Sequence, residues 1–122
     1  MTPLVLVVDN EEGLLVLFSS LVRRMGYQVL QAESGMAALD ILGQQTPDLL
    51  ILDLAMPEVD GFEVLRRVIT MPHLDKMPVM VLTATSLGPA PEDVAHRIGA
   101  WVKRPVRPEV FDATVRELLG GA

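Results

Sequence analysis

The sequence predicts a doubly wound α/β fold, in which helices cover both faces of a parallel sheet. Five short runs rich in valine, leucine and isoleucine recur along the 122 residues. The segments between these runs carry hydrophobic residues at the spacing of one helix face. Strands that alternate with helices form parallel sheets joined by right-handed crossovers. Ligands of such sheets bind beyond the carboxyl ends of the strands.

Each expected strand is a short hydrophobic run of the kind that is buried on both faces of a sheet. The five runs are Leu4 to Val8, Tyr27 to Leu30, Leu49 to Leu52, Val79 to Leu82, and Trp101 to Val102. The third run is followed by an acid, Asp53. A lone buried carboxylate is costly, so Asp53 either faces solvent at the mouth of the sheet or pairs with a cation. Both alternatives make it a candidate site residue.

The first two expected helices follow from hydrophobic periodicity and from the residues that end each segment. Gly26 stops the first helix, whose buried face is expected to carry Leu14, Phe18, Leu21 and Met25. Ser34 is the expected N-cap of the second helix, and Thr46-Pro47 breaks the chain after it. The side chains expected to be buried on the second helix are Ala38, Ile41 and Leu42.

The remaining three expected helices lie in the second half of the chain. The third ends near Met71-Pro72 and is marked by Phe62, Leu65 and Ile69. A shorter fourth helix starts after the loop containing Pro89 and Pro91, ends at Gly99, and is marked by Val94 and Ile98. Pro108 is a favourable first-turn residue for the fifth, whose inward side chains are Phe111, Val115 and Leu118.

Length and composition predict one domain over residues 1–122 and exclude several classes of function. Half of the residues are hydrophobic, and 16 acidic against 10 basic residues give a net charge of −6. This charge disfavours binding to nucleic acid or to an anionic membrane. The chain has no cysteine, hence no disulfide and no thiolate metal site. No hydrophobic run is long enough to span a membrane and the N-terminus lacks the features of a signal peptide, so a cytoplasmic location is expected.

Polar and charged residues follow the expected strands at their carboxyl ends. In chain order they are Asp9, Asn10, Glu11 and Glu12, then Asp53, then Thr83 and Ala84, and finally Lys103, Arg104 and Pro105. In a parallel sheet these residues meet at one edge. Two carboxylates about 4 Å apart repel by about 4 kcal/mol at an effective dielectric constant near 20, so a counter-cation is expected. An all-oxygen donor set without cysteine or histidine suits Mg²⁺.

Phosphoryl transfer onto a carboxylate uses this combination of groups. The metal ion neutralises the approach of two anions, a hydroxyl and a cation hold the phosphoryl oxygens, and Asp53 attacks in line. Acids at strand ends also serve as helix caps or as solvated turn residues, and spacing leaves these alternatives open. Glu12 fits the first turn of the following helix, and Glu11 fits either that position or a metal site. His73 and His96 are expected to be solvated and away from this edge.

Four motifs, VLVVDNEE, ILDLAMPEVDG, VLTA and the K-R-P run at 103–105, resemble in order and over the whole chain the receiver domain of bacterial two-component response regulators. The resemblance implies a flavodoxin-like three-layer sandwich with the strand order 2-1-3-4-5. It also implies that Asp53 accepts a phosphoryl group from a phosphohistidine on a sensor histidine kinase or phosphotransfer protein.

The resemblance further implies a role for several other residues. Thr83 is implied to be the switch hydroxyl, and Ala84 the small neighbour that leaves the phosphoryl group accessible to it. Asp9 is implied to bind Mg²⁺ through water, while the backbone carbonyl of Ala55 is a direct ligand. Ala55 and Thr85 occupy positions that steer water in the family. Both are small, so fairly ready hydrolysis of the phosphoryl group is expected.

The sequence departs from the family pattern at two positions. Asn10 stands where family members usually carry a second acid that ligates Mg²⁺, so weaker Mg²⁺ binding is expected. The family's Lys-Pro pair is Arg104-Pro105 here, with Lys103 one position earlier. Neighbours along a strand point to opposite faces, so only one of the two cations reaches the site. Arg104 is favoured because it directly precedes the proline, and in the family this peptide bond is commonly cis.

Signalling in the family runs through the face formed by the fourth helix, fifth strand and fifth helix to a downstream protein or domain. The resemblance places Trp101 at the aromatic switch position, where its ring turns inward when Thr83 moves. Alternatively, Trp101 is a partly buried strand aromatic without that role. Receiver dimers use variable surfaces, so a homodimer is also possible.

Three other functions compete with that of a phosphoacceptor. A degenerate receiver that acts only as a docking module is favoured by Asn10 and Arg104. A phosphohydrolase is disfavoured because Asp53-Leu54-Ala55 lacks the second acid of such enzymes. A dinucleotide-binding domain is disfavoured because no G-x-G-x-x-G follows the first strand.

Overall fold

The computed structural model describes residues 2–83 and 90–120. Five parallel strands form one sheet within these residues, in the order β2-β1-β3-β4-β5. The strands are β1 (Leu4–Val8), β2 (Gln28–Ala32), β3 (Leu49–Asp53), β4 (Val79–Thr83) and β5 (Ala100–Lys103). The doubly wound parallel sheet and the strand order expected from the sequence are therefore confirmed.

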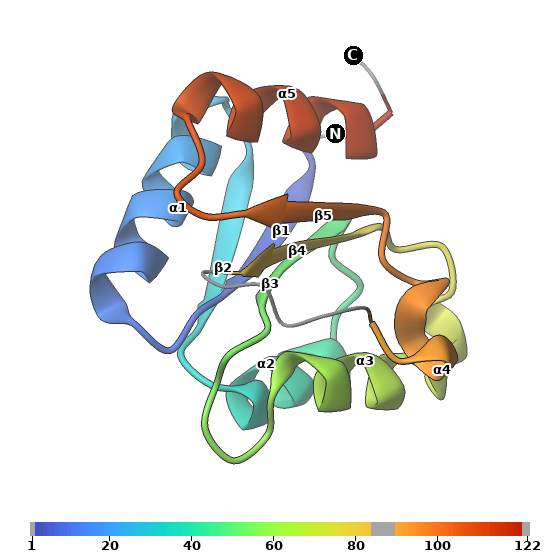
Figure 1. Ribbon diagram of the computed structural model, residues 1–122. Helices are drawn as coiled ribbons and strands as arrows, with labels where there is room; N and C mark the ends of the chain where they lie inside the picture. Colours follow the sequence, from blue (N-terminus) through green and yellow to red (C-terminus); the bar gives the residue numbers. More distant parts are fainter. Residues whose placement is uncertain (1, 84–89, 121–122) are drawn as a thin grey trace.

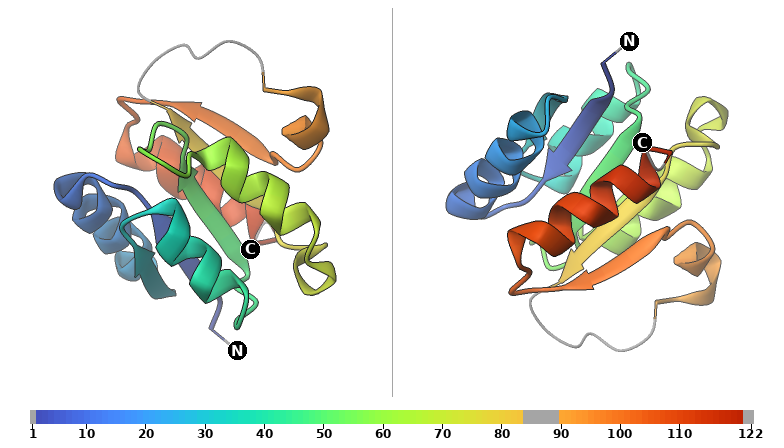
Figure 2. Two further views of the ribbon diagram at one scale, coloured as in Figure 1. Left: turned by 90° about the horizontal axis from the view of Figure 1, so that it is seen from below. Right: turned by 90° about the horizontal axis from the view of Figure 1, so that it is seen from above.

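Five α-helices and one short 3₁₀ helix connect the strands. They are α1 (Glu12–Arg24), α2 (Gly35–Leu42), α3 (Gly61–Ile69), the 3₁₀ helix η1 (Pro72–Leu74), α4 (Glu92–Ala95) and α5 (Pro108–Leu118). Helices α1 and α5 cover one face of the sheet, and α2, α3 and α4 cover the other (Figure 1). Figure 2 shows the two faces in turn, with α2 and α3 in front in one view and α5 and α1 in front in the other. The result is a three-layer sandwich.

Alternation along the strands divides the interior into two hydrophobic cores. On the central strands β3 and β4 every residue is buried, as expected for strands covered on both faces. Along β1, Val5 and Val7 pack toward α1 and α5, while Leu6 and Val8 pack toward α2 and α3. The rings of Phe18 and Phe111 stack with their centroids 5.2 Å apart and join α1 to α5.

Several element boundaries differ from those expected. Strand β2 begins at Gln28, because the N–H of Tyr27 still donates to the Val22 carbonyl at the end of α1, 3.4 Å away. The buried face of α3 is made by Val64, Leu65 and Val68, so Ile69, at its last position, is exposed rather than buried. Hydrophobic spacing located the helix and placed Leu65 on its buried face, but it did not single out Val64 and Val68.

Helix α4 is a single turn and ends at Ala95, so Ile98 does not belong to it. After Ala95 the backbone turns toward the sheet, and the N–H of Gly99 donates to the carbonyl of Val79 at 2.8 Å. The guanidinium of Arg97 donates to the carbonyls of Leu74, Asp75 and Met77 around η1. The backbone N–H groups of Arg97 and Ile98 donate to carbonyls three residues back, as in turns, so the α-helix does not continue to Gly99.

Two expectations about single side chains have different outcomes. Ser34 is the N-cap of α2, and its hydroxyl accepts a hydrogen bond from the N–H of Ala37 at 3.0 Å. His73 is exposed, as expected, but it also makes a specific long-range contact. Its Nε2 lies 2.7 Å from the carbonyl oxygen of Leu42, the last residue of α2. The imidazole therefore ties η1 to the end of α2, a long-range contact that no local pattern shows.

No helix among residues 2–83 and 90–120 combines the length and hydrophobicity needed to cross a membrane.

Candidate functional site

Three charged side chains that are far apart in the sequence meet at the carboxyl edge of the sheet. Asp9 follows β1, Asp53 ends β3, and Arg104 follows β5. The strand register brings the two acids side by side, because Val8 of β1 pairs with Leu52 of β3. Arg104 bridges them, with Nη1 donating to Oδ2 of Asp9 at 3.4 Å and Nη2 donating to Oδ1 of Asp53 at 3.2 Å. The buried end of the third strand is thus paired with a cation.

The three side chains are largely removed from water. Asp9 is 1% and Asp53 2% exposed, and the side chain of Arg104 is 12% exposed. Burial raises the pKa of Asp53 and the neighbouring carboxylate of Asp9 raises it further, while the N–H of Ala55 and the guanidinium oppose the shift. Burial likewise raises the pKa of Asp9, against the N–H of Glu11 and Arg104. Both acids therefore take up a proton more readily than an exposed aspartate does.

Each carboxylate also orders the loop that follows its strand. Oδ1 of Asp9 accepts a hydrogen bond from the N–H of Glu11 at 2.9 Å, and Oδ1 of Asp53 accepts one from the N–H of Ala55 at 3.3 Å. An aspartate that bonds its own backbone two residues on forms a compact turn. These turns direct Asn10 and Ala55, both exposed, around the two acids.

The end of β5 is fixed against the end of β4. The N–H of Arg104 donates to the carbonyl oxygen of Thr83 at 2.7 Å, and the peptide bond between Arg104 and Pro105 is cis. Thr83 is buried one residue beyond the position where β4 pairs with Asp53. Lys103 is exposed, so of the two neighbouring cations the structure brings only Arg104 to the acids.

Trp101 and Ala84 are the remaining residues that the sequence predicted for the site. Trp101 lies on β5 and is 40% exposed, with its ring centroid 6.4 Å from that of Phe62 on α3. Ala84, and with it Thr85, lies outside the described residues.

The donor set fits a hard cation that keeps most of its water. Within residues 2–83 and 90–120, no group of three or more carboxylate, imidazole or thiolate side chains is placed to hold a metal ion. Mg²⁺ binds through one or two carboxylates and several waters, which matches Asp9 and Asp53. Asn10 and the carbonyl of Ala55 are the neighbouring uncharged oxygens.

Sequence reasoning missed two contacts that shape the site. A Cβ atom added to Gly61 would lie 2.8 Å from the carbonyl oxygen of Asp53 and 2.8 Å from Cα of Leu54, so α3 packs directly on the backbone of the acid. Gly61 is the first residue of α3, after the N-cap Asp60, and only coordinates show what it touches. The bridge from Arg104 to both acids was also not foreseen. The sequence feature that could have indicated this bridge is the arginine itself, because a guanidinium can donate to two carboxylates at once.

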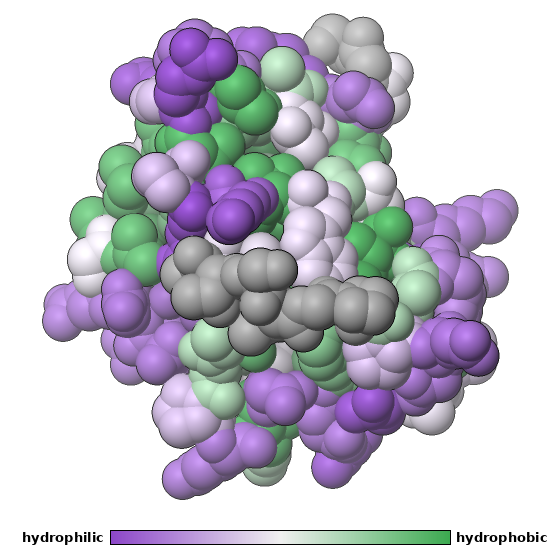
Figure 3. All heavy atoms as spheres, in the orientation of Figure 1, coloured by the Kyte–Doolittle hydropathy of each residue, from purple (hydrophilic) through white to green (hydrophobic). Residues whose placement is uncertain are grey.

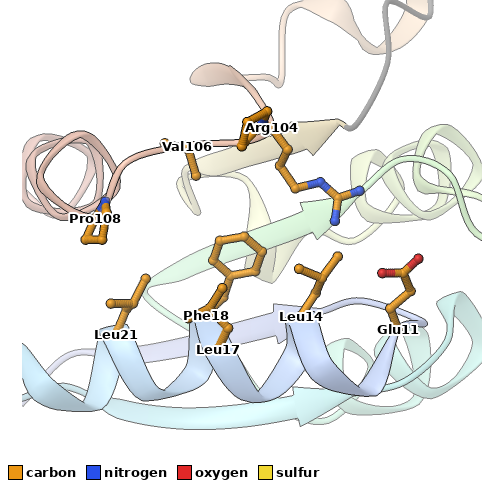
Figure 4. Close-up of a pocket in the computed structure, with 9 residues that line it drawn as sticks. Glu11, Leu14, Leu17, Phe18, Leu21, Arg104, Val106 and Pro108 are labelled. Carbon is orange, nitrogen blue, oxygen red and sulfur yellow. The ribbon is translucent and has the colours of Figure 1, made fainter.

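A hydrophobic groove of about 390 Å³ adjoins the site between α1 and the segment after β5. Figure 4 shows its walls, with Leu14, Leu17, Phe18 and Leu21 on α1 facing Val106 and Pro108. Glu11 and Arg104 lie together at one end of the groove. Hydrophobic side chains also reach the surface over α1 in the space-filling view (Figure 3). On this helix Val16 and Leu17 are 54% and 48% exposed.

Comparison with known proteins gives consistent findings in sequence and in structure. A family model described as the response regulator receiver domain matches residues 5–110. The chain is 31% identical over 123 residues to the polar-differentiation response regulator DivK of Brucella ovis, with full coverage of both chains. It is 32% identical to the transcriptional regulatory protein AfsQ1 of Streptomyces coelicolor, covering 96% of this chain and 51% of that protein.

Solved structures share the same fold. The chemotaxis response regulator CheY4 of Vibrio cholerae matches with a TM-score of 0.85 and 26% identity, over 97% of this chain and 99% of that one. The receiver domain of a sensor histidine kinase from Pseudomonas aeruginosa, described with a magnesium ion in its active-site cleft, matches with a TM-score of 0.87 and 18% identity. That match covers 98% of this chain and 99% of the other, and at this identity it speaks for the fold.

Proposed function

Because the chain belongs to the response regulator receiver domain family, we propose that it accepts a phosphoryl group on Asp53 from a phosphohistidine and thereby switches a protein partner. One observation carries the proposal. The carboxylate of Asp53 ends the central strand beside a second acid, with the guanidinium of Arg104 on its oxygen. In α/β sheets this edge is where ligands bind.

The transfer needs a nucleophile and a positive charge around the moving group. An oxygen of Asp53 attacks the phosphorus atom in line, the bond from phosphorus to the imidazole nitrogen breaks, and the imidazole leaves with the electron pair. Arg104, which already touches Asp53, then pairs with the phosphoryl oxygens. The hydroxyl of Thr83, at the end of the neighbouring strand, likewise donates a hydrogen bond to a phosphoryl oxygen.

Mg²⁺ is part of the proposal. Asp9, Asp53, the amide oxygen of Asn10 and the backbone carbonyl of Ala55 would hold it. When bound, the ion supplies positive charge that lowers the repulsion between two anions.

Incubation with a small phosphodonor such as acetyl phosphate tests the function directly. In the presence of MgCl₂, the intact mass is expected to rise by one phosphoryl group, and peptide mapping after borohydride reduction is expected to place it at residue 53. Chelation of the metal is expected to slow labelling by at least about tenfold, since it removes charge stabilisation worth a few kcal/mol. A chain that stays unlabelled would instead support the rival proposal, a docking module that works without phosphorylation.

The groove between α1 and the segment after β5 is our proposed contact for the phosphohistidine protein. Arg104 and Glu11 belong both to the groove lining and to the surroundings of the two acids. A donor protein that reaches Asp53 therefore also covers the groove. Its lining is mainly hydrophobic, which suits burial against a helix of the partner. Trp101 and Val110, 40% and 42% exposed on β5 and α5, mark a separate surface for the downstream partner.

Leu17→Lys is expected to slow transfer from a phosphohistidine protein by about tenfold, since burying a leucine contributes roughly 1.5 to 3 kcal/mol. Labelling by acetyl phosphate is expected to stay unchanged, because Leu17 does not touch the acids. Val16→Lys is the matched control, since Val16 is similarly exposed on α1, at 54% against 48% for Leu17, and does not line the groove. Equal losses in both variants, or loss with the small donor too, would contradict this docking surface.

A further inference from the structure

We infer that Gly35, the first residue of α2, is a positioning residue for the phosphoryl-acceptor site. Because it lacks a side chain, the loop that follows Asp53 rests directly on the helix, and this contact holds the backbone of Ala55 beside Asp53. The inference rests on the proposed function, because Ala55 supplies one of the proposed Mg²⁺ ligands.

The loop between β3 and α3, residues 54–60, is tied to Asp53 at both of its ends. At its start, the N–H of Ala55 donates to Oδ1 of Asp53 at 3.3 Å. At its end, the N–H of Gly61 donates to the carbonyl oxygen of Leu54 at 3.2 Å, and Gly61 lies directly against the carbonyl oxygen of Asp53. A displacement in the middle of the loop therefore reaches the backbone around Asp53.

The middle of the loop adopts a backbone conformation that its sequence does not favour. Glu58 has a φ of +64°, and within the described part of the chain it is the one non-glycine residue with a positive φ. A side chain disfavours this left-handed region, so such a residue persists where the surrounding structure holds it. The path of the loop therefore depends on a contact outside the loop.

Gly35 provides that contact. It is buried, and a Cβ atom added to it would overlap the carbonyl oxygen of Val59 and lie 2.9 Å from the Cβ atom of Val59. The side chain of Val59, the residue after Glu58, packs against the hydrophobic core between the sheet, α2 and α3. The first turn of α2 is itself fixed, because the hydroxyl of Ser34 accepts a hydrogen bond from the N–H of Ala37 at 3.0 Å. The loop thus meets a fixed backbone with no room for a methyl group.

Gly35→Ala is expected to push the loop away from α2. Because both ends of the loop are tied to Asp53, the shift is expected to move Ala55 relative to the carboxylate. A residue that orients a metal ligand from outside the site contributes about tenfold or more to metal affinity. The nucleophile itself is unchanged by the substitution, so weaker Mg²⁺ binding is the expected defect.

Two measurements on Gly35→Ala test the inference. In NMR spectra recorded without metal, the backbone amide of Ala55 is expected to shift, while that of Glu11, which donates to Asp9, stays in place. In labelling by acetyl phosphate, the MgCl₂ concentration that gives half the maximal rate is expected to rise about tenfold, with the rate at saturating MgCl₂ close to that of the wild type. A role in stability alone would lower the labelling rate equally at every MgCl₂ concentration.

Gly43→Ala is the matched control, because Gly43 stands at the other end of α2 and has a φ of −70°, which alanine adopts readily. A Cβ atom at Gly43 would lie 3.4 Å from its nearest neighbour, the carbonyl oxygen of Leu39. The half-saturating MgCl₂ concentration of this variant is expected to stay within about twofold of the wild type. Its Ala55 amide is expected to remain unshifted.

Val59→Ala tests the same contact from the side of the loop. It adds no atom, and it removes the methyl groups of Val59 that pack beside Gly35. The loop is then held less firmly, so the Ala55 amide is expected to shift and the half-saturating MgCl₂ concentration to rise about threefold.

The inference is overturned if Gly35→Ala folds and leaves both the Ala55 amide and the half-saturating MgCl₂ concentration as in the wild type. Equal changes in Gly43→Ala would also overturn it. If Gly35→Ala does not fold, Val59→Ala decides, and wild-type behaviour of that variant overturns the inference. If the wild type takes up no label at any MgCl₂ concentration, the proposed function fails, and the metal-free Ala55 amide then decides whether Gly35 positions the loop.

Discussion

Asp53→Asn is expected to abolish phosphoryl labelling and, at the same time, to raise the free energy of unfolding at pH 7 by roughly 0.5 to 2 kcal/mol. The amide cannot act as the nucleophile, which removes labelling. Its oxygen still accepts the hydrogen bonds that Ala55 and Arg104 donate to Asp53. The substitution leaves Asp9 and Arg104 as a balanced pair, so the buried excess of negative charge disappears.

The gain in stability is expected to depend on pH with a definite sign. Burial and Asp9 raise the pKa of Asp53 above its usual value of 3.8, so the folded state binds the proton more tightly than the unfolded state. The stabilisation from that proton is complete below pH 3.8 and is lost as the pH rises through the folded pKa. The difference between Asp53→Asn and wild type is therefore expected to grow from about pH 4 toward neutral pH.

Urea denaturation at a series of pH values, together with intact-mass labelling, measures both effects. Asp40→Asn serves as control, since Asp40 is an exposed acid on α2, and its stability is expected to change by less than about 0.5 kcal/mol. If Asp53→Asn is labelled at the wild-type rate, the acceptor is another residue. If its stability falls at pH 7, the site does not carry excess negative charge.

Gly61→Ala is expected to lower the free energy of unfolding by about 2 to 3 kcal/mol. In most helices the same change is favourable, since alanine is the better helix former by about 1 kcal/mol. Here the new methyl group would meet the carbonyl oxygen of Asp53 and the backbone of Leu54 at 2.8 Å. Backbone atoms in a buried strand cannot move aside cheaply, so α3 or the strand end must shift.

Gly13→Ala on α1 is the matched control, because nothing lies within 4 Å of a Cβ atom at that position. Its stability is expected to rise by about 1 kcal/mol. Urea denaturation of the two variants beside wild type is thus expected to give changes of opposite sign. A shift of the strand end would also move Asp53, so slower labelling by acetyl phosphate is expected for Gly61→Ala alone. Stabilisation of both variants would mean that the contact at Gly61 relaxes without cost.

The fold could be predicted from the sequence because its determinants are local. The hydrophobic runs that became β1, β3 and β4 are buried, and the alternation of strand and helix fixes a parallel sheet. The positions of Asp9 and Asp53 followed from the strand ends. What could not be predicted depends on long-range contacts: the single turn of α4, where Arg97 hydrogen-bonds to η1, and the imidazole of His73 at the end of α2.

The site was predictable in composition but not in connectivity. The sequence predicted that two acids, a hydroxyl and two cations lie at the carboxyl edge of the sheet. It could not show which cation pairs with which acid. That choice depends on how the chain leaves β5, where the N–H of Arg104 is held by Thr83 and Lys103 points elsewhere. The path of the backbone just before a side chain determines which partner that side chain reaches. Hydrophobic periodicity does not encode this path.

The contact between Phe62 and Trp101 gives the molecule an optical reporter of its own. Trp101 is the sole tryptophan, and its indole lies partly in water and partly against the ring of Phe62. Its emission wavelength therefore reports how α3 and β5 meet. A blue shift on phosphorylation would show the indole entering the interior, and a red shift would show it leaving Phe62 for solvent.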